Sequence, residues 1–329
     1  MSTAPLVEAK GLVKHFPLPR RHMFEPRNVV HAVDGVSFDV RPGETFGLVG
    51  ESGCGKTTVG KLLLYLEPLS AGALTIADHT VADMSQAQEL AFRRDVQAVF
   101  QDPYGSLNPR HKVLDVIGEP IQVQEKLSGR AVRDRVRELL AHVGLPAGSE
   151  NLYPHEFSGG QRQRIAIARA ISVRPRFIVL DEAVSALDVS IRAQVLNLLR
   201  DLQEEFDLTY LFIAHDLAVV EFMSERIAVM YLGKIVETGT AGDIYREARH
   251  PYTQALLRAA TSTTRPGSAD DGLAIRGEVP SPINPPSGCR FRTRCPFAQP
   301  RCAEEEPALA PLGPSHAVAC HFHESIRAG

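Results

Sequence analysis

Three short apolar runs, each followed at once by polar residues, are spread along the chain. Apolar runs without alternation are typical of strands buried on both faces, as in a parallel α/β sheet. Ligands bind such sheets beyond the carboxyl ends of the strands, so polar residues at those ends are candidate site residues. The runs are Thr45–Val49, Phe177–Leu180 and Tyr210–Ala214, followed by Gly50, by Asp181 and Glu182, and by His215, respectively.

A helical period lies between the first and second runs. Apolar residues recur there at the spacing of one helix face, and a glycine follows where the helix should stop. We therefore expect strands and helices to alternate, as in an α/β protein. The face consists of Val132, Val136, Leu139, Leu140 and Val143, and the glycine is Gly144.

Composition limits the functional classes. The 329 residues suffice for one large domain with a smaller appendage, and 44% apolar with 23% charged residues is ordinary for a globular protein. A net charge of -3 gives no support to a broad nucleic-acid surface. No run approaches the ~18 apolar residues of a membrane helix, and the N-terminus lacks the basic start and apolar core of a secretory signal. We expect a cytosolic chain that reaches a membrane only through a partner.

The first apolar run leads into a glycine-rich loop that fits the pattern G-x-x-x-x-G-K-[ST], with a helix predicted from Lys56 onward. Glycines let the backbone wrap around phosphate, and the loop amides with the helix N-terminus bind the anion. Lys56 is expected to reach the β- and γ-phosphates of ATP, and Thr57 to ligate Mg²⁺. The predicted nucleotide-binding loop is Gly50-Glu51-Ser52-Gly53-Cys54-Gly55-Lys56-Thr57-Thr58, in which Cys54 is a small loop residue without a catalytic role.

The second apolar run ends in an acidic pair. Asp181 is expected to hold Mg²⁺ through its water shell, and Glu182 to position and polarise the attacking water. A solvated acidic pair is the alternative, which the phosphate loop elsewhere in the chain disfavours.

Phe157-Ser158-Gly159-Gly160-Gln161 resembles the signature motif of ABC ATPases, usually LSGGQ. Ser158 can cap the following helix, with Gln161 three residues on in a capping-box arrangement. Gly159 and Gly160 would let phosphate approach the amides of the first turn. A plain helix start accounts for the serine and the glutamine but not for two glycines, which disfavour helix.

The resemblance to ABC ATPases extends to further motifs in the family's order, and it implies a role for one residue in each. Gln101 matches the Q-loop, which contacts Mg²⁺ or water and senses the membrane partner. Asp188, in Ser185-Ala186-Leu187-Asp188, matches the D-loop across a dimer interface. His215 matches the switch histidine at the γ-phosphate, and Phe16 matches the aromatic residue that stacks on adenine.

Segments near the C-terminus, and one segment that follows Gln101, narrow the resemblance to the oligopeptide/dipeptide importer ATPases, especially the second of their two ATPase subunits. That family implies a heterodimer with a homologous ATPase subunit under two permease subunits, fed by an extracytoplasmic peptide-binding protein, at the cytoplasmic face of the membrane and without nucleic acid. Each of two ATP sites would pair one phosphate loop with the other subunit's signature. The segments are His250-Pro251-Tyr252-Thr253, Gly277-Glu278-Val279-Pro280-Ser281-Pro282, Gly288–Pro296 (GCRFRTRCP) and Asp102–Arg110 (DPYGSLNPR).

The motifs predict a P-loop ABC ATPase of α/β class with a helical subdomain and a small C-terminal extension. The nucleotide-binding domain is expected over residues 1–264, with the helical subdomain over about 85–172. Residues 265–288, rich in Pro, Gly and Ser, predict a linker, and 289–329 a cysteine-containing extension.

Four of the five cysteines lie in that extension, with the spacing C-x5-C-x6-C-x17-C. Four thiolates can hold Zn²⁺ or a [4Fe–4S] cluster, and free thiols or disulfides are the remaining alternatives. Pro296 after Cys295 and the absence of C-x2-C pairs favour a cluster, as does the family resemblance; we expect a structural staple. Nearby arginines would offset the thiolate charge, and three histidines are spare, solvated ligand candidates. The cysteines are Cys289, Cys295, Cys302 and Cys320, the arginines Arg290, Arg292, Arg294 and Arg301, and the histidines His316, His321 and His323.

Two other functions compete with the transporter ATPase. A soluble ABC ATPase acting on nucleic acid or the ribosome usually carries two cassettes or a long coiled-coil insertion, whereas this chain has one phosphate loop and no sustained heptads. A metal-dependent regulatory module with a vestigial ATPase is disfavoured by intact Lys56, Asp181, Glu182 and His215.

Overall fold

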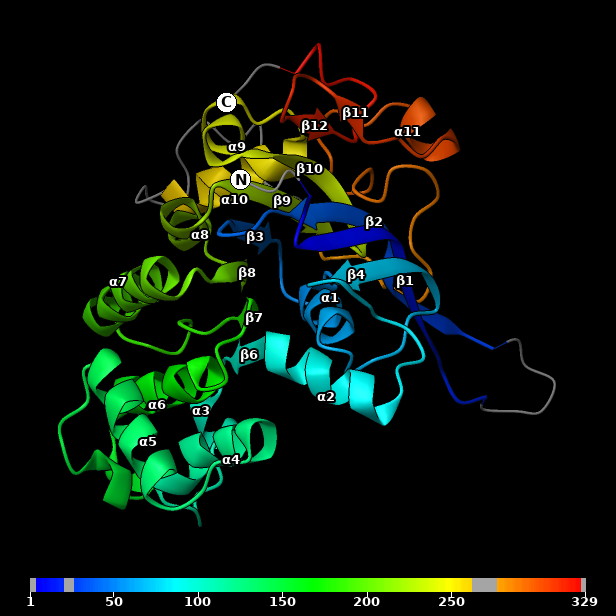
Figure 1. Cartoon of the computed structure of the whole chain (residues 1–329). Helices are drawn as coiled ribbons and strands as arrows, with labels where there is room; N and C mark the ends of the chain where they lie inside the picture. Colours follow the sequence, from blue (N-terminus) through cyan, green and yellow to red (C-terminus); the bar gives the residue numbers. More distant parts are fainter. Residues whose placement is uncertain (1–3, 21–26, 262–276, 327–329) are drawn as a thin grey trace. The chain divides into compact units, whose positions relative to one another are not determined.

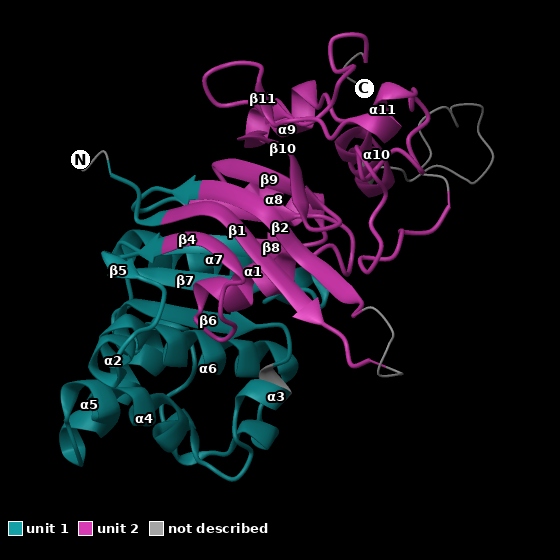
Figure 2. Ribbon diagram, turned by 90° about the vertical axis from the view of Figure 1, so that its right-hand side faces the viewer, with its two compact units in different colours: residues 1–7, 39–44, 75–212 teal, residues 8–38, 45–74, 213–329 magenta. Residues whose placement is uncertain are grey.

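The computed structural model describes residues 4–20, 27–261 and 277–326 of the chain (Figure 1). These fall into two compact units (Figure 2). The first unit comprises residues 1–7, 39–44 and 75–212, and the second comprises residues 8–38, 45–74 and 213–329. The predicted linker over 265–288 lies in part outside the described residues. The predicted domain bounds stay a prediction.

The first unit contains a parallel strand pair with a group of helices. β6 pairs with β7 in parallel, with Val96 opposite Phe177 and Phe100 opposite Asp181. Helices α3 to α6 pack on one another beside β6 (Figure 1). The elements of this unit are β5 (His79–Thr80), α2 (Gln86–Asp95), β6 (Val96–Phe100), α3 (Pro103–Ser106), α4 (Val113–Glu125), α5 (Arg130–His142), η1 (Ser149–Asn151), η2 (Pro154–Glu156), α6 (Gly159–Ile171), β7 (Phe177–Asp181) and α7 (Val189–Phe206).

Apolar periodicity explains these elements. Every residue of β7 is buried, as expected for a strand with both faces covered. Helix α5 buries Val132, Val136, Leu139 and Leu140, and the chain turns at Gly144 in the left-handed region (φ 69°). The predicted helical face and its stop are confirmed.

The second unit is built on strands of one sheet in the order β11-β12-β10-β9-β3. β3 runs parallel to β9, and β10 runs antiparallel to β9. Strands β2, β1 and β4 are neighbours in a separate sheet. The elements are β1 (Val7–Pro17), most of β2 (Val29–Val40), β3 (Thr45–Val49), α1 (Lys56–Leu63), α8 (Leu217–Met223), β9 (Arg226–Tyr231), β10 (Lys234–Thr240), α9 (Ala241–Glu247), α10 (Pro251–Thr261), α11 (Arg301–Glu304), β11 (Ala310–Pro311) and β12 (Ala317–Val318).

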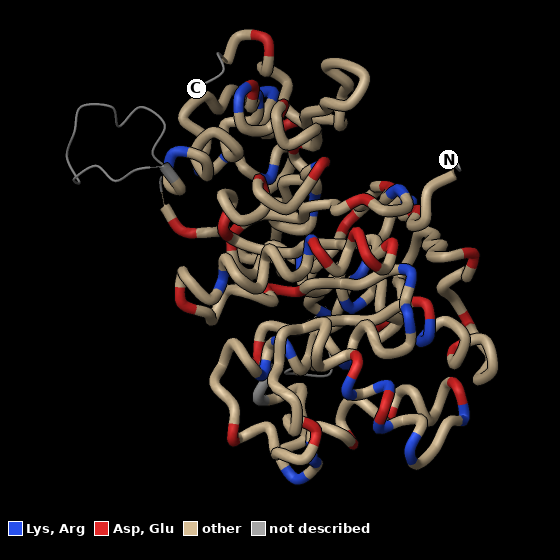
Figure 3. Tube along the Cα trace, turned by 60° about the vertical axis from the view of Figure 1, so that its left-hand side comes forward, with Lys and Arg blue, Asp and Glu red and all other residues tan. Residues whose placement is uncertain are grey.

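The chain passes between the units at several points, including one within β4 (Ala71–Ile76) and one within β8 (Thr209–Ala214). All six residues of β8 are buried, so the third predicted strand is confirmed together with the first two. Basic and acidic residues are interspersed along the Cα trace (Figure 3).

The C-terminal extension continues the sheet of the second unit. β12 pairs antiparallel with β10, with Glu237 opposite Val318, and β11 pairs with β12. Glu237 is fully buried, and its carboxylate accepts hydrogen bonds from the backbone N–H groups of Arg249 (2.7 Å) and His250 (3.1 Å). The same carboxylate lies 2.8 Å from Nε2 of His316. The described part of the extension is therefore an integral part of the second unit.

Candidate functional site

The glycine-rich loop joins β3 to α1, as predicted, and its last glycine shapes the start of the helix. Gly55 is the residue before α1, with a left-handed φ of 110°, and no side chain caps the helix. A Cβ at Gly55 would lie 2.1 Å from the Ala32 carbonyl oxygen. Only glycine fits there, and it provides no side-chain cap for the first turn of α1.

Lys56 lies at the centre of the loop. Its side chain is buried, and Nζ donates to the carbonyl oxygens of Gly50 (2.7 Å) and Glu51 (3.0 Å). The adjacent Cys54 is buried as well, and burial raises the pKa of its thiol. A buried thiol with a raised pKa is a poor nucleophile, in keeping with a packing role for Cys54.

Two side chains from distant parts of the second unit hold Glu51. The Glu51 N–H donates to the Tyr252 hydroxyl (2.8 Å). Nη1 and Nη2 of Arg294 donate to the Glu51 carboxylate at 2.6 and 3.1 Å. Burial by itself would lower the pKa of Arg294, but the hydrogen bonds to Glu51 and Tyr231 outweigh it and raise that pKa. Motif reasoning did not assign this role to Tyr252 or Arg294.

Phe16 and His215 also belong to the second unit. Phe16 lies near the end of β1 and is half-buried, so it is no core residue, and Nζ of Lys14 lies 4.8 Å from its ring centroid. His215 follows β8 and is exposed. Both side chains are accessible to a ligand.

The acidic pair ends β7 in the first unit. Asp181 is its last residue and is 8% exposed. Glu182 adopts a left-handed φ of 50°, which is unusual for a residue with a side chain and is common at functional sites. The backbone N–H and hydroxyl of Ser185 both donate to the Glu182 carbonyl oxygen, at 3.1 and 2.9 Å. These two hydrogen bonds therefore fix the turn that orients Glu182.

The signature-like segment opens α6 with the predicted capping box. The Ser158 side chain accepts from the Gln161 N–H (3.3 Å), and the Gln161 side chain accepts from the Ser158 N–H (2.9 Å). Ser158 and Gly159 are exposed, and a Cβ at Gly159 would meet nothing within 4 Å. At Gly160, however, a Cβ would lie 2.4 Å from Cγ2 of Ile191, so this glycine is also required by the packing of α6 on α7.

Two further predicted residues of the first unit flank secondary structure. Gln101 follows β6 and is exposed. Asp188 precedes α7 and is exposed without capping the helix, and the next residue, Val189, is 81% exposed.

Comparison with known proteins agrees with these motifs. The profile of the ABC transporter family matches residues 33–185, and that of the oligopeptide/dipeptide transporter C-terminal region matches residues 236–302. The oligopeptide transport ATP-binding protein AppF of Bacillus subtilis is 48% identical over 97% of this chain and 97% of its own. The dipeptide transport ATP-binding protein DppF of Escherichia coli is 48% identical over 96% of this chain and 94% of its own.

The chain belongs to the family of oligopeptide/dipeptide transport ATP-binding proteins. It is an ABC ATPase. A solved structure of the ATP-binding cassette MJ0796, a dimer bound to ADP and Pi, covers 71% of this chain and 98% of its own with a TM-score of 0.62 and 28% identity. No helix in the described part of this ABC ATPase combines the length and the hydropathy needed to span a membrane.

The C-terminal extension of this ABC ATPase brings its four cysteines together around one cavity. All four are free thiols, which disfavours the disulfide alternative. Burial raises the pKa of Cys295 to about 12 and that of Cys320 to about 11, and it also raises the pKa of Cys289. Thiols of this kind stay protonated at neutral pH unless a metal replaces the proton. The cavity is lined by Cys289, Cys295, Cys302 and Cys320 together with aromatic and aliphatic side chains.

The spacing of the sulfur atoms bears on which metal fits. Among the described residues, only His15, His31 and Asp34 place three donor atoms within 4.8 Å of one another, so no three cysteine sulfurs lie that close. Tetrahedral zinc with Zn–S bonds of about 2.3 Å needs sulfurs about 3.8 Å apart. A four-iron cluster is larger and holds its thiolates farther apart than a zinc ion does.

The predicted roles of the nearby arginines and histidines change with the structure. Arg290 and Arg294 do not serve chiefly to offset thiolate charge, because their guanidinium groups bind the carboxylates of Asp34 and Glu51. His316 is buried beside Glu237 rather than solvated, so it is no spare ligand. Arg292 donates to Ser287, Arg301 to Glu305, His321 lies beside the Glu305 carbonyl and His323 beside the Cys320 carbonyl.

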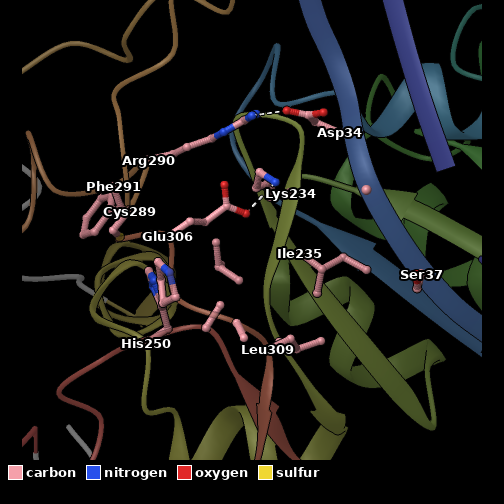
Figure 4. A pocket seen from close by; sticks show the side chains of 16 residues that line it. Asp34, Ser37, Lys234, Ile235, His250, Cys289, Arg290, Phe291, Glu306 and Leu309 are labelled. Carbon is pink, nitrogen blue, oxygen red and sulfur yellow. Dashed lines mark hydrogen bonds and ion pairs between the residues drawn. The ribbon is translucent and has the colours of Figure 1, made fainter. Parts of the chain in front are cut away.

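A second cavity of about 220 Å³ lies between the extension and β2 and β10 of the second unit (Figure 4). Its charged side chains are paired: Arg290 with Asp34, and Lys234 with Glu306 at 2.6 Å. These two pairs link the extension to the core of the unit. The Arg290 charge on Asp34 also opposes cation binding at the neighbouring His15–His31–Asp34 group.

Proposed function

We propose that this chain binds and hydrolyses ATP with Mg²⁺ as the energy-supplying subunit of a peptide importer. The observation that carries the proposal is the phosphate loop itself. Gly55 opens α1 without a side-chain cap, and buried Lys56 folds over the loop beside it. A helix N-terminus that opens at a glycine without a side-chain cap, next to a lysine, is typical of a site for a nucleotide phosphate.

Each of the remaining motif residues has its own role in hydrolysis in this proposal. Lys56 neutralises charge on the β- and γ-phosphates, and Asp181 with Thr57 and Gln101 holds Mg²⁺ or its water. Glu182 positions and polarises the attacking water, and His215 contacts the γ-phosphate. Bound Mg²⁺ supplies compensation for phosphate charge. The left-handed backbone of Glu182 supports its assignment, because such strain is usually kept where a side chain must be aimed.

The signature segment serves a second ATPase subunit in this proposal. Ser158 and Gly159 expose the N-terminus of α6, and Val189 beside the D-loop residue Asp188 exposes an apolar side chain. The MJ0796 cassette, 28% identical, is a dimer in its structure. We infer a heterodimer with a homologous ATPase subunit, in which each signature faces the other's phosphate loop.

Peptide cargo and membrane partners follow from the relatives. AppF and DppF are named for oligopeptide and dipeptide transport, and the C-terminal profile that matches residues 236–302 carries the same description. We infer two permease subunits, an extracytoplasmic peptide-binding protein and a location at the cytoplasmic face of the membrane. These relatives favour the transporter over the alternative, a soluble ABC ATPase acting on nucleic acid or the ribosome.

Co-purification and turnover test this function together. The full chain should co-purify with two membrane subunits and a homologous ATPase, and peptide with its binding protein should raise ATP turnover of that complex. The chain alone should hydrolyse ATP poorly. Rapid hydrolysis by the dilute monomer, or stable association with ribosomes or nucleic acid instead of membrane subunits, would contradict the proposal.

We further propose a [4Fe–4S] cluster on Cys289, Cys295, Cys302 and Cys320, with zinc as the alternative. The four sulfurs line one cavity, yet no three of them lie within the distance that zinc requires. Such a group cross-links the extension, whose segments are too short to bury a core of their own.

Metal content decides between the alternatives. Anaerobically purified protein should be brown with about four irons per chain, whereas zinc would leave it colourless with about one metal per chain. Cys295→Ser should abolish or strongly weaken binding of either metal, while Cys54→Ser, outside the module, should not. Protein with neither metal and four freely alkylated C-terminal thiols would end the proposal.

A further inference from the structure

One short segment of the extension reaches back to the phosphate loop. This arginine segment, residues 290–294, carries Arg294, which binds the Glu51 carboxylate through both terminal nitrogens (2.6 and 3.1 Å). Arg294 is only 7% exposed, and Nη1 also lies 3.5 Å from the Tyr231 hydroxyl. A bidentate pair of this kind fixes the orientation of both partners as well as joining them.

A second arm of the arginine segment reaches the loop through the turn between β9 and β10. Arg290 Nη1 donates to the Leu232 carbonyl oxygen (2.5 Å), and the N–H of the next residue, Gly233, donates to the Cys54 carbonyl oxygen (2.8 Å). The turn between β9 and β10 thus accepts a hydrogen bond from the extension and donates one to the phosphate loop.

Aromatic packing fills the space between the two arms. The Phe291 ring lies 5.2 Å from that of Tyr231 and 5.4 Å from that of Tyr252, centroid to centroid. Tyr252 accepts the Glu51 N–H through its hydroxyl. Both the backbone and the side chain of Glu51 are therefore held by groups that touch the arginine segment.

Electrostatics gives this arrangement a consequence for nucleotide binding. Glu51 is the second residue of a loop that receives a polyanion, and an unpaired carboxylate there would repel it. Arg294 cancels that charge within the half-buried surroundings of the loop, where solvent screening is weak.

We propose that the arginine segment clamps the phosphate loop, with Arg294 as a positioning residue that neutralises and immobilises Glu51 so that the loop can accept ATP. The inference rests on the proposed assignment of residues 50–58 to ATP. Cys289 and Cys295 stand immediately before and after the segment and line the same cavity. Whatever holds those two sulfurs also holds the clamp.

The test compares variants of the full chain by titration with ATP. Arg294→Gln should weaken ATP binding roughly tenfold, a size common for coupling between two sites. Glu51→Gln combined with Arg294→Gln should recover most of the affinity, because the repelling carboxylate is gone. Arg294→Lys, which keeps the cation, should lose less than Arg294→Gln. Hydrogen exchange of amides 50–57 should rise in Arg294→Gln.

A matched control comes from the same segment. Arg292 donates to Ser287 and not to the loop, so Arg292→Gln should leave ATP affinity unchanged. Wild-type affinity in Arg294→Gln would overturn the inference. So would a double variant that binds no better than Arg294→Gln, because the loss would then come from disturbed packing. Wild-type protein that binds no ATP would instead overturn the proposed function.

Discussion

Two helix N-termini in this chain match phosphate-binding motifs, and they differ in how they are capped and held. α1 begins at left-handed Gly55 with no side-chain cap, and residues far away in the sequence hold its loop. α6 begins at Ser158 with a reciprocal capping box formed by its own first turn, and it is exposed. The loop before α1 is held by residues distant in sequence, whereas the start of α6 is held by hydrogen bonds within its own first turn.

The difference matches the two tasks we propose. A loop that wraps its own nucleotide must leave its amides free, so its conformation has to be supported by neighbours. A surface that meets a nucleotide bound to another subunit has to keep its shape before the partner arrives, and a local cap provides that. Substitutions at the two ends should therefore have different effects.

Lys56→Ala should impair nucleotide binding and hydrolysis at the start of α1. Loss of one preorganised charge beside the phosphates should reduce turnover of the assembled complex at this chain's site about 10²–10³-fold, and ATP affinity should fall as well. Lys61→Ala is the matched control, because Lys61 is an exposed residue in the last turn of the same helix. Unchanged ATP binding in Lys56→Ala would remove Lys56 from the site.

Gly160→Ala should damage the α6 end through packing. The added methyl would meet Ile191 Cγ2 at 2.4 Å, so we expect the free energy of unfolding to fall by about 1–3 kcal/mol, the usual cost of overpacking. Gly159→Ala is the control, because a Cβ there meets nothing within 4 Å. Equal losses in the two variants by denaturant unfolding would contradict this account of Gly160.

Ser158→Ala should have the smallest effect on stability. It removes the side-chain acceptor of the capping box and should lower the free energy of unfolding by about 1 kcal/mol. Ser158→Thr keeps an acceptor at the same position and should lose less. If both variants unfold at the same denaturant concentration as the wild type, the cap contributes nothing to folding.

Short-range rules explain what the sequence could predict. The three strands, the start of α1 at Lys56, the buried face of α5 and the Ser158–Gln161 box each depend on residues within a few positions of one another. Spacing and side-chain type are sufficient information for such features.

The features that the sequence could not predict depend on contacts between residues far apart along the chain. Arg294 and Glu51 are 243 positions apart, so neither motif predicts their pairing. The same holds for β12 on β10 and for Ile191 against Gly160, which depend on how distant elements pack. Proximity in sequence pairs the arginines with the thiolates, whereas the fold directs Arg290 and Arg294 to carboxylates.

Hydrolysis at this chain's own site tests the central claim most directly. Glu182→Gln in the assembled transporter, with the partner ATPase subunit's phosphate loop disabled, should retain ATP binding because the phosphate loop is untouched. Single-turnover hydrolysis of the bound ATP should slow by ~10²–10⁴-fold, the usual size of a general-base contribution. Hydrolysis near the rate of the same complex with Glu182 intact would contradict the account.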